Sequence, residues 1–474
     1  MLYPRLAFWC ISMKATITSV LSMRRITARA GYNRWLIPPA ALAIHLCIGQ
    51  AYAFSVFNLP LTRAIGVTRP APGDWKLTDV GWTFTIAIVF IGLAAAFGGK
   101  WLERVGPRAS GVASACLWGL GFVVAALGVR LHNLWLLHLG YGVLGGSGVG
   151  IGYITPVSTL IRWFPDRRGL ATGMAIMGFG GGAMVAAPLS EALMRRFATP
   201  SSVGVAETFL VLGAGYFVAM LGGALLFRLP PEGWSPRGGS GSEATKALPS
   251  DRYVPVDVAT LTPQFTLLWA VLFLNVTAGI GVLGQASAMI QEVFKGRIDA
   301  SAAAGFVGLL SLFNMGGRFA WASASDVIGR KATFTIFFLV GAGLYALVPV
   351  AGRIGSVPLF VVCFAAILSM YGGGFATIPA YLSDLFGTRQ VGAIHGRLLT
   401  AWSAAGVAGP VLVNYLRQYQ IDQGVEKAAA YNVTMNLMAG LLLVGLVCNL
   451  LVTRVAPRHA RSQAEAEAGV GAAH

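Results

Sequence analysis

Apolar segments long enough to cross a bilayer, about 20 residues each, recur along this chain in two sets separated by a polar stretch. The first set covers residues 35–58, 80–99, 109–129, 134–161, 169–191 and 206–228. The second set covers residues 264–290, 302–324, 332–352, 356–380, 391–415 and 430–453. The pattern predicts an all-α membrane protein with twelve transmembrane helices in two groups of six.

The polar stretch between the two sets has the composition of a flexible linker. It begins with the sequence Leu-Pro-Pro-Glu-Gly at residue 229 and contains Gly-Gly-Ser-Gly-Ser from residue 238. The predicted organisation is an N-terminal segment (1–34), a six-helix bundle (35–228), the linker (229–263), a second six-helix bundle (264–453) and a tail (454–474). The sequence leaves open whether residues 1–22 belong to the mature protein, since Met23 is an alternative start.

Composition and charge support a bilayer as the main solvent. Hydrophobic residues make up 56% and charged residues 11% of the chain, against roughly 45–50% and about 25% in soluble domains. The net charge of +17 is spread over loops between apolar segments, which argues against a nucleic-acid partner. The side that holds the termini and the linker carries 22 Lys and Arg, and the other side carries 11. This bias predicts cytoplasmic termini in a bacterial inner membrane.

Two short turns in corresponding places of the two halves repeat one pattern. Each turn has an acid three residues before a glycine and then a base, which suits a tight turn with charges at neighbouring helix ends. The residues of interest are Gly99, Glu103, Arg104 and Gly106 after the second segment, and Asp326, Gly329 and Arg330 after the eighth. Six helices plus six with this repeat predict two bundles related by a pseudo-twofold axis around a central site.

These turns resemble the signature loop of the major facilitator superfamily, and the resemblance covers the chain from Asn33 to about Arg454. Three further segments are similar to the oxalate/formate antiporter branch, which is related to the monocarboxylate transporters. They are Asn33-Arg34-Trp35, the segment 162–169 (Arg-Trp-Phe-Pro-Asp-Arg-Arg-Gly) and the glycine-rich segment 178–182. The resemblance implies the major facilitator fold and transport of a small molecule, and it leaves the substrate open.

Arg318 is a charged residue well inside the eighth apolar segment, where a guanidinium is costly. Such charges usually face a bundle interior and mark a functional site, although an arginine that reaches back to the membrane boundary is the alternative. The resemblance implies a substrate-binding arginine in this part of the segment. Helical spacing places Asn314 on the same face as Arg318. Two parallel N–H donors match the two oxygens of a carboxylate.

Trp402 decides which class of carboxylate the sequence favours. The resemblance implies a lysine in the eleventh segment of the oxalate exchanger, and the matching position here is Trp402. A dicarboxylate would keep one charge unpaired, which costs several kcal/mol in a buried site. The sequence therefore favours a monocarboxylate.

Other polar and aromatic residues are candidates for substrate binding, although each could instead serve only in helix packing. His395 shares a helix face with Trp402, and an unperturbed histidine changes charge near neutral pH. Tyr52 and Tyr153 match aromatic positions that the resemblance implies near the substrate, and both also fit ordinary core packing. Asn275 is a candidate ligand, although contacts between helices explain such a residue at least as well.

The function predicted is secondary transport of a small organic anion by alternating access, as exchange or as proton-coupled symport. Asn314 stands where proton-coupled relatives often have an acid, which favours exchange. The alternatives are a dicarboxylate antiporter of the oxalate/formate type and a transporter-like metabolite sensor. Catalytic sets, cofactor motifs and metal-ligand spacings are not apparent, so an enzyme is not expected. The expected partners are a carboxylate anion and the lipid bilayer, with a monomeric transport unit.

Overall fold

A computed structural model describes residues 23–29, 31–231, 234–236, 252–283 and 285–462 of the protein. Residues 1–22, for which the sequence leaves open whether they belong to the mature protein, lie outside these ranges. Parts of the predicted linker and of the predicted tail lie outside them as well.

The N-terminal half of the chain is helical throughout its long segments. In chain order its elements are α2 (Met23–Ile26), η1 (Arg34–Leu36), α3 (Ile37–Ile48), η2 (Gly49–Ala53), α4 (Ser55–Leu61), α5 (Leu77–Arg130), α6 (Leu134–Leu137), the π-helical η3 (His138–Gly145), α7 (Gly146–Trp163), α8 (Arg168–Phe197) and α9 (Val205–Leu226).

The C-terminal half follows a short strand. Its elements are β1 (Arg252–Tyr253), α10 (Val256–Ala259), α11 (Pro263–Leu283), α12 (Ala286–Val293), α13 (Ala300–Ile328), α14 (Arg330–Arg353), α15 (Val357–Phe386), α16 (Val391–Leu398), α17 (Thr400–Asp422), α18 (Asn432–Leu451), η4 (Pro457–His459) and β2 (Arg461–Ser462). The side chains of Asp299 and Ser356 cap the starts of α13 and α15 by accepting backbone N–H bonds.

Ten helical segments within the described ranges are long and apolar enough to cross a membrane. One of them is α5, whose 54 residues are interrupted by Gly106 at φ 83°. α13, which has 29 residues and carries Arg318, is not among the ten. The helical membrane fold predicted from the sequence is confirmed, while the number of twelve spans stays a prediction.

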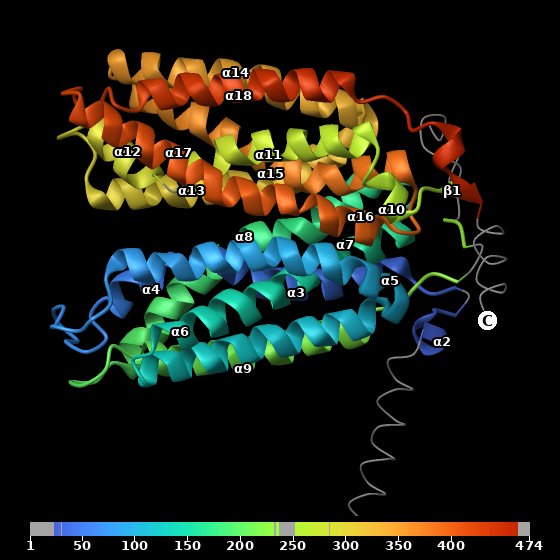
Figure 1. Ribbon diagram of the computed structural model, residues 1–474, viewed down its shortest axis with the longest axis horizontal. Helices are drawn as coiled ribbons and strands as arrows, with labels where there is room; N and C mark the ends of the chain where they lie inside the picture. The colour runs from blue at the N-terminus through green and yellow to red at the C-terminus, as the bar shows by residue number, and fades with distance from the viewer. Residues whose placement is uncertain (1–22, 30, 232–233, 237–251, 284, 463–474) are drawn as a thin grey trace, which may run out of the picture.

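The two halves lie side by side as two layers of roughly parallel helices (Figure 1). α2, α10 and β1 lie together at one end of the bundle, which we call the linker end, and α4 and α12 lie at the other end, the far end (Figure 1). β1 pairs antiparallel with β2, with Arg252 opposite Ser462, so the linker and the tail meet at the linker end. This two-residue pairing is a small departure from an all-α chain.

Glycine allows close helix contacts inside the N-terminal half. Gly142, Gly146 and Gly150 recur every four residues and therefore share one face of η3 and α7. A Cβ atom at Gly146 would lie 2.6 Å from the carbonyl oxygen of Ala87, and one at Gly150 would lie 2.3 Å from that of Ile91. The backbones of α5 and α7 therefore touch, as small residues permit in membrane helices.

Candidate functional site

Arg318 lies at the boundary between the two halves, on α13 where it packs against α8 and α15. Its side chain is fully buried, with 0% of its surface exposed, which is inconsistent with an arginine that reaches the membrane boundary. Nε donates a hydrogen bond to Oδ1 of Asn314 at 3.1 Å. Nη1 and Nη2 have no hydrogen-bond partner. The two NH2 groups of this buried cation are therefore free to bind an anion.

Aromatic rings from both halves flank this guanidinium. The Cζ atom of Arg318 lies 5.2 Å from the ring centre of Phe375 on α15 and 5.7 Å from that of Phe179 on α8. Both distances are within the range of a cation–π interaction. A Cβ atom at Gly180 would lie 2.8 Å from Nε and 3.0 Å from Cδ of Arg318, so this glycine leaves the space that the arginine occupies.

Tyr52, Tyr153 and Trp402 complete the aromatic cluster. The Trp402 ring lies 5.5 Å from that of Tyr153, 6.4 Å from that of Tyr52 and 5.5 Å from that of Phe179. Both tyrosines interact electrostatically with Arg318. The Tyr153 hydroxyl and the Trp402 indole nitrogen are buried without a hydrogen-bond partner. Aromatic residues from five separate elements (η2, α7, α8, α15 and α17) therefore converge around one cation.

His395 lies at the edge of this cluster. Its ring centre is 5.9 Å from that of Tyr153, and only 1% of the residue is exposed. Asn314 and the four predicted residues Tyr52, Tyr153, Trp402 and His395 are thus brought together with Arg318 or with one of its neighbours.

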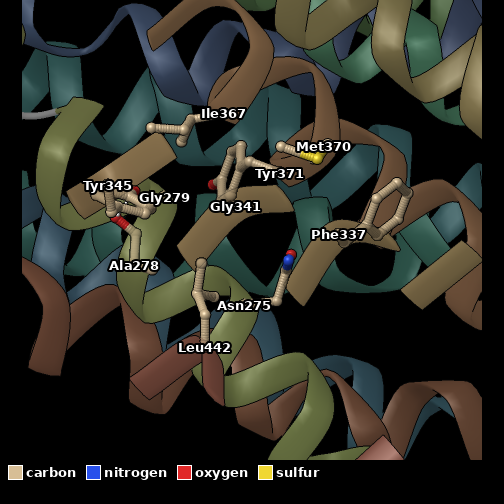
Figure 2. Close-up of a pocket in the computed structure, with 10 residues that line it drawn as sticks. All are labelled: Asn275, Ala278, Gly279, Phe337, Gly341, Tyr345, Ile367, Met370, Tyr371 and Leu442. Carbon is tan, nitrogen blue, oxygen red and sulfur yellow. Dashed lines mark hydrogen bonds between the residues drawn. The ribbon is translucent and has the colours of Figure 1, made fainter. Parts of the chain in front are cut away.

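Asn275 lines a small cavity in the C-terminal half (Figure 2). The cavity measures about 10 Å³ and is also lined by Tyr345 and Tyr371. A space of this size holds about one water molecule. Tyr371 connects this region to the cluster, because its hydroxyl lies 3.5 Å from that of Tyr52. Asn275 therefore lines this cavity together with Tyr371.

Phe179, Phe375 and Tyr371 were not among the residues predicted from the sequence. Phe179 lies inside the glycine-rich segment 178–182, whose small residues indicate close helix packing. The adjacent Gly180 makes room for Arg318, so this glycine is the sequence feature that could have pointed to Phe179. Phe375 follows three consecutive glycines on α15 and gives no comparable signal of its own.

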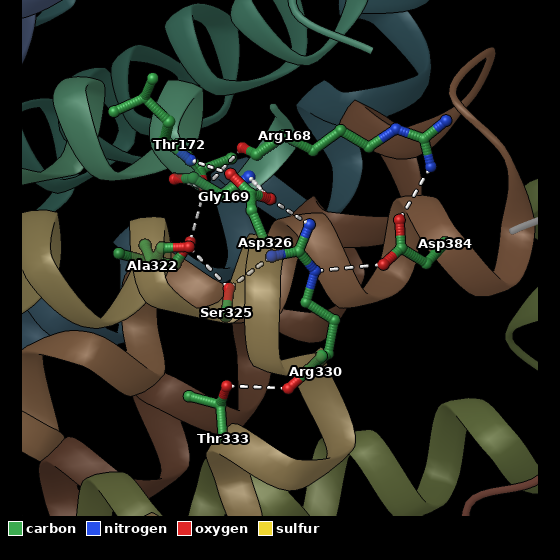
Figure 3. A network of polar contacts seen from close by, with 12 residues as sticks. Arg168, Gly169, Thr172, Ala322, Ser325, Asp326, Arg330, Thr333 and Asp384 are labelled. Atoms are coloured by element: carbon green, nitrogen blue, oxygen red, sulfur yellow. Dashed lines mark hydrogen bonds and ion pairs between the residues drawn. The ribbon is translucent and has the colours of Figure 1, made fainter. Parts of the chain in front are cut away.

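Asp326, in the predicted turn with Gly329 and Arg330, joins the two halves (Figure 3). Asp326 accepts backbone hydrogen bonds from Gly169 and from Leu170 of α8, both at 2.8 Å, and pairs with Arg330 at 2.6 Å. Gly329 has a φ of 87°, a value that disfavours other residues. The charge pattern read from the sequence thus forms a contact across the two halves.

Asp384 on α15 extends the same network. It accepts hydrogen bonds from Arg168 of α8 at 2.8 Å and from Nε of Arg330 at 3.1 Å (Figure 3). The carboxylate thus binds one arginine from each half.

The turn in the N-terminal half uses its charges differently. Glu103 pairs with Arg162 of α7, and Arg162 donates to the carbonyl oxygen of Arg389 at 3.0 Å. Gly106 has a φ of 83°, while Arg104 is exposed. A Cβ atom at Gly99 would lie 2.6 Å from Cα of Ala393, so Gly99 allows α5 to touch α16.

Removing the Asp384 carboxylate is expected to weaken the contact between the halves. Each partly buried ion pair contributes on the order of 1 kcal/mol, so Asp384→Asn should increase opening at the linker end by about tenfold. The measurement is maleimide labelling of Ala322→Cys, a buried position on α13, after replacement of the five native cysteines. Glu191→Gln is the control, since it breaks only the exposed pair with Arg195 within α8. Unchanged labelling of the Asp384 variant would contradict this role.

Two helical halves with a buried cation between them and charged turns at one end are typical of transporters built from two repeated bundles. The family model for the Major Facilitator Superfamily matches residues 40–410. The chain belongs to the major facilitator superfamily. It is therefore an integral membrane protein of a transporter family.

Curated relatives of the chain include a member of the branch that its sequence resembles. The chain is 28% identical to the oxalate:formate antiporter of Oxalobacter formigenes, over 80% of this chain and 83% of the antiporter. It is 27% identical to the uncharacterized MFS-type transporter YhjX of Escherichia coli (strain K12), over 77% and 83% of the two chains. It is 26% identical to human monocarboxylate transporter 11, over 81% and 77%. The predicted resemblance to the oxalate/formate antiporter branch is confirmed.

Solved structures support the same fold for this superfamily member. The crystal structure of the human organic anion transporter MFSD10 has a TM-score of 0.62 at 14% identity, and the match covers 88% of this chain and all of that chain. At this identity the likeness establishes the fold alone.

Proposed function

We propose that this major facilitator protein transports a small organic monocarboxylate by alternating access, with Arg318 as the group that binds the carboxylate. The observation that carries the proposal is the pair of buried Nη atoms of Arg318 that have no partner, at the boundary between the halves. A carboxylate supplies two acceptors in the matching geometry. The relatives named as an oxalate:formate antiporter and a monocarboxylate transporter support the same substrate class.

Exchange is the transport mode that the site favours, with proton-coupled symport as the alternative. In the described part of the site, Arg318 has Asn314 as its hydrogen-bond partner and no acid pairs with it. Reorientation without an anion would then carry an unpaired buried cation, which is unfavourable. In exchange, an anion is bound to Arg318 during each reorientation of the halves, so the cation is never buried without a counter-ion.

Counterflow in proteoliposomes tests the proposal. Purified protein is reconstituted, and the efflux of labelled lactate is measured with and without unlabelled lactate outside. External lactate should accelerate the efflux by at least about tenfold. Equal efflux under both conditions would rule out exchange, and lack of any lactate flux would rule out the monocarboxylate substrate.

A dicarboxylate antiporter of the oxalate/formate type is the second candidate function, and Trp402 separates the two. The Trp402 ring is fully buried against Phe375 at 5.2 Å and gives no second cation. Trp402→Lys should therefore increase the preference for oxalate over lactate by about tenfold, measured as the ratio of half-saturating concentrations in counterflow. If the wild-type protein at neutral pH already prefers oxalate, the monocarboxylate assignment fails.

The topology proposed with this function places the linker end in the cytoplasm of a bacterial cell. The excess of basic residues on that side supports it. The Asp326 and Asp384 contacts would then form the cytoplasmic closure between the halves. The other predicted domain boundaries and the monomeric transport unit stay proposals. The alternative function, a transporter-like sensor, would bind lactate but would produce no lactate flux in proteoliposomes.

A further inference from the structure

His45 and His395 lie on opposite sides of Tyr153 and come from different halves of the protein. His45 is on α3 and its ring lies 5.4 Å from that of Tyr153, while His395 is on α16 and its ring lies 5.9 Å from it. Both histidines are buried, with exposures of 0% and 1%, and they interact electrostatically with each other. The two imidazoles therefore flank one tyrosine of the anion site.

The imidazole nitrogens of this pair are unusual because none of them is hydrogen-bonded. All four atoms are buried without a partner. The carbonyl groups of Ala41 and Tyr153 lie near His45 but do not meet hydrogen-bond geometry. Buried polar groups are normally satisfied, and an exception calls for an explanation such as a proton or a ligand bound at another stage.

The charges around the pair determine when it can accept a proton. Arg318 interacts with His45 and repels a second positive charge there. A bound carboxylate would cancel this repulsion, and a bound dicarboxylate would reverse it.

Other titratable groups near the pair are already engaged or neutral. Tyr52 and Tyr153 face it from η2 and α7 and carry no charge at neutral pH. Glu103 approaches the start of α16 from α5 but pairs with Arg162. On α10, Asp257 pairs with Lys100 and with Arg397. Arg318, together with the anion that it binds, is therefore the main charged group that acts on His45.

We infer that His45 and His395 form a shared proton site that admits a dicarboxylate together with one proton, so that pH selects the charge class of the substrate. The inference rests on the proposed function of Arg318. With neutral histidines the site carries one positive charge and matches a monocarboxylate. When one imidazole nitrogen takes up a proton, the site carries two and matches a dianion. The proton binds with the dianion and leaves with it on the other side.

Binding measurements on the full-length purified protein test this inference. The affinities for lactate and oxalate are measured by calorimetry at about pH 8 and about pH 6, the range in which histidine titrates. Oxalate affinity should increase at least about tenfold toward the lower pH, because one coupled proton gives up to about tenfold per pH unit. Lactate affinity should change by less than about threefold. Oxalate affinity that is independent of pH would overturn the inference.

Variants identify the groups that bind the proton. In the double variant His45→Gln and His395→Gln, the pH dependence of oxalate affinity should vanish. His138→Gln is the matched control, because His138 is also buried but its Nδ1 is hydrogen-bonded to Thr83 at 3.0 Å. A double variant with the wild-type pH dependence would overturn the inference.

Proton flux covers the case in which the double variant does not fold. Wild-type proteoliposomes with a trapped pH dye should acidify when oxalate enters in exchange for lactate, and should show no acidification during lactate–lactate exchange. Oxalate entry without acidification would overturn the inference. If wild-type protein binds no lactate at all, the proposed function fails, whatever the result for oxalate, so the two failures are distinguishable.

Discussion

Replacement of Arg318 by alanine is expected to weaken monocarboxylate binding by at least about 100-fold. Its Nη1 and Nη2 atoms are buried and unpartnered, so each would form a charge-assisted hydrogen bond with a bound carboxylate. Such bonds contribute about 1.5–3 kcal/mol each, and about 2.8 kcal/mol in total corresponds to a 100-fold change in affinity. Asn314 and the aromatic rings would remain, but they carry no positive charge.

The measurement is the affinity for lactate by calorimetry, with two further variants for comparison. Arg318→Lys keeps the charge but loses the paired donors, so its affinity should lie between those of the wild type and the alanine variant. Arg397→Ala is the matched control in the same half. Arg397 binds Asp257 and Thr260 outside the aromatic cluster, and its loss should leave lactate affinity within about threefold of wild type. Equal losses of lactate affinity in Arg318→Ala and Arg397→Ala would contradict the prediction, because they would show a general effect of protein charge and no specific role of Arg318.

Enlarging Gly180 is expected to reduce lactate affinity by about tenfold or more without removing any polar group. A Cβ atom at this position would lie 2.8 Å from Nε and 3.0 Å from Cδ of Arg318, and the further atoms of Gly180→Leu would occupy space that the guanidinium needs. Overpacking of this kind costs about 1–3 kcal/mol. The arginine must then move from its position between Phe179 and Phe375.

A thermal-melting comparison separates this effect from simple unfolding. Gly316→Ala, on the helix that carries Arg318, is the control because a Cβ atom there meets nothing within 4 Å. Gly180→Leu should retain a cooperative melting transition and lose lactate stabilisation, whereas Gly316→Ala should keep both. Wild-type lactate affinity in the Gly180 variant would show that the arginine position is not critical for binding.

The helical fold and the charged turns were predictable because local patterns encode them. Apolar length predicts spans, and an acid followed by a glycine and a base predicted contacts at helix ends, which Asp326 forms. The partners of these charges were not predictable. Asp384 binds Arg168 and Arg330 across more than 50 residues of sequence in each case, and a single sequence carries no record of such distances.

The site was predictable only where a local sequence pattern marks a residue. Arg318 stands out because a charge inside an apolar segment is costly. Phe179 and Phe375 do not stand out, since aromatic residues are common in any apolar core. Asn275 looked like a candidate because it is polar in an apolar segment. It lines a small cavity together with Tyr371, an arrangement that depends on the packing of α11 against α15.

The position of a bound monocarboxylate, determined in a structure of the complex, tests the central claim most directly. The account predicts that both carboxylate oxygens lie within hydrogen-bond distance of Nη1 and Nη2 of Arg318, with the carbon end against Trp402. An anion bound elsewhere, while these two nitrogen atoms bond to protein groups or face lipid, would contradict it.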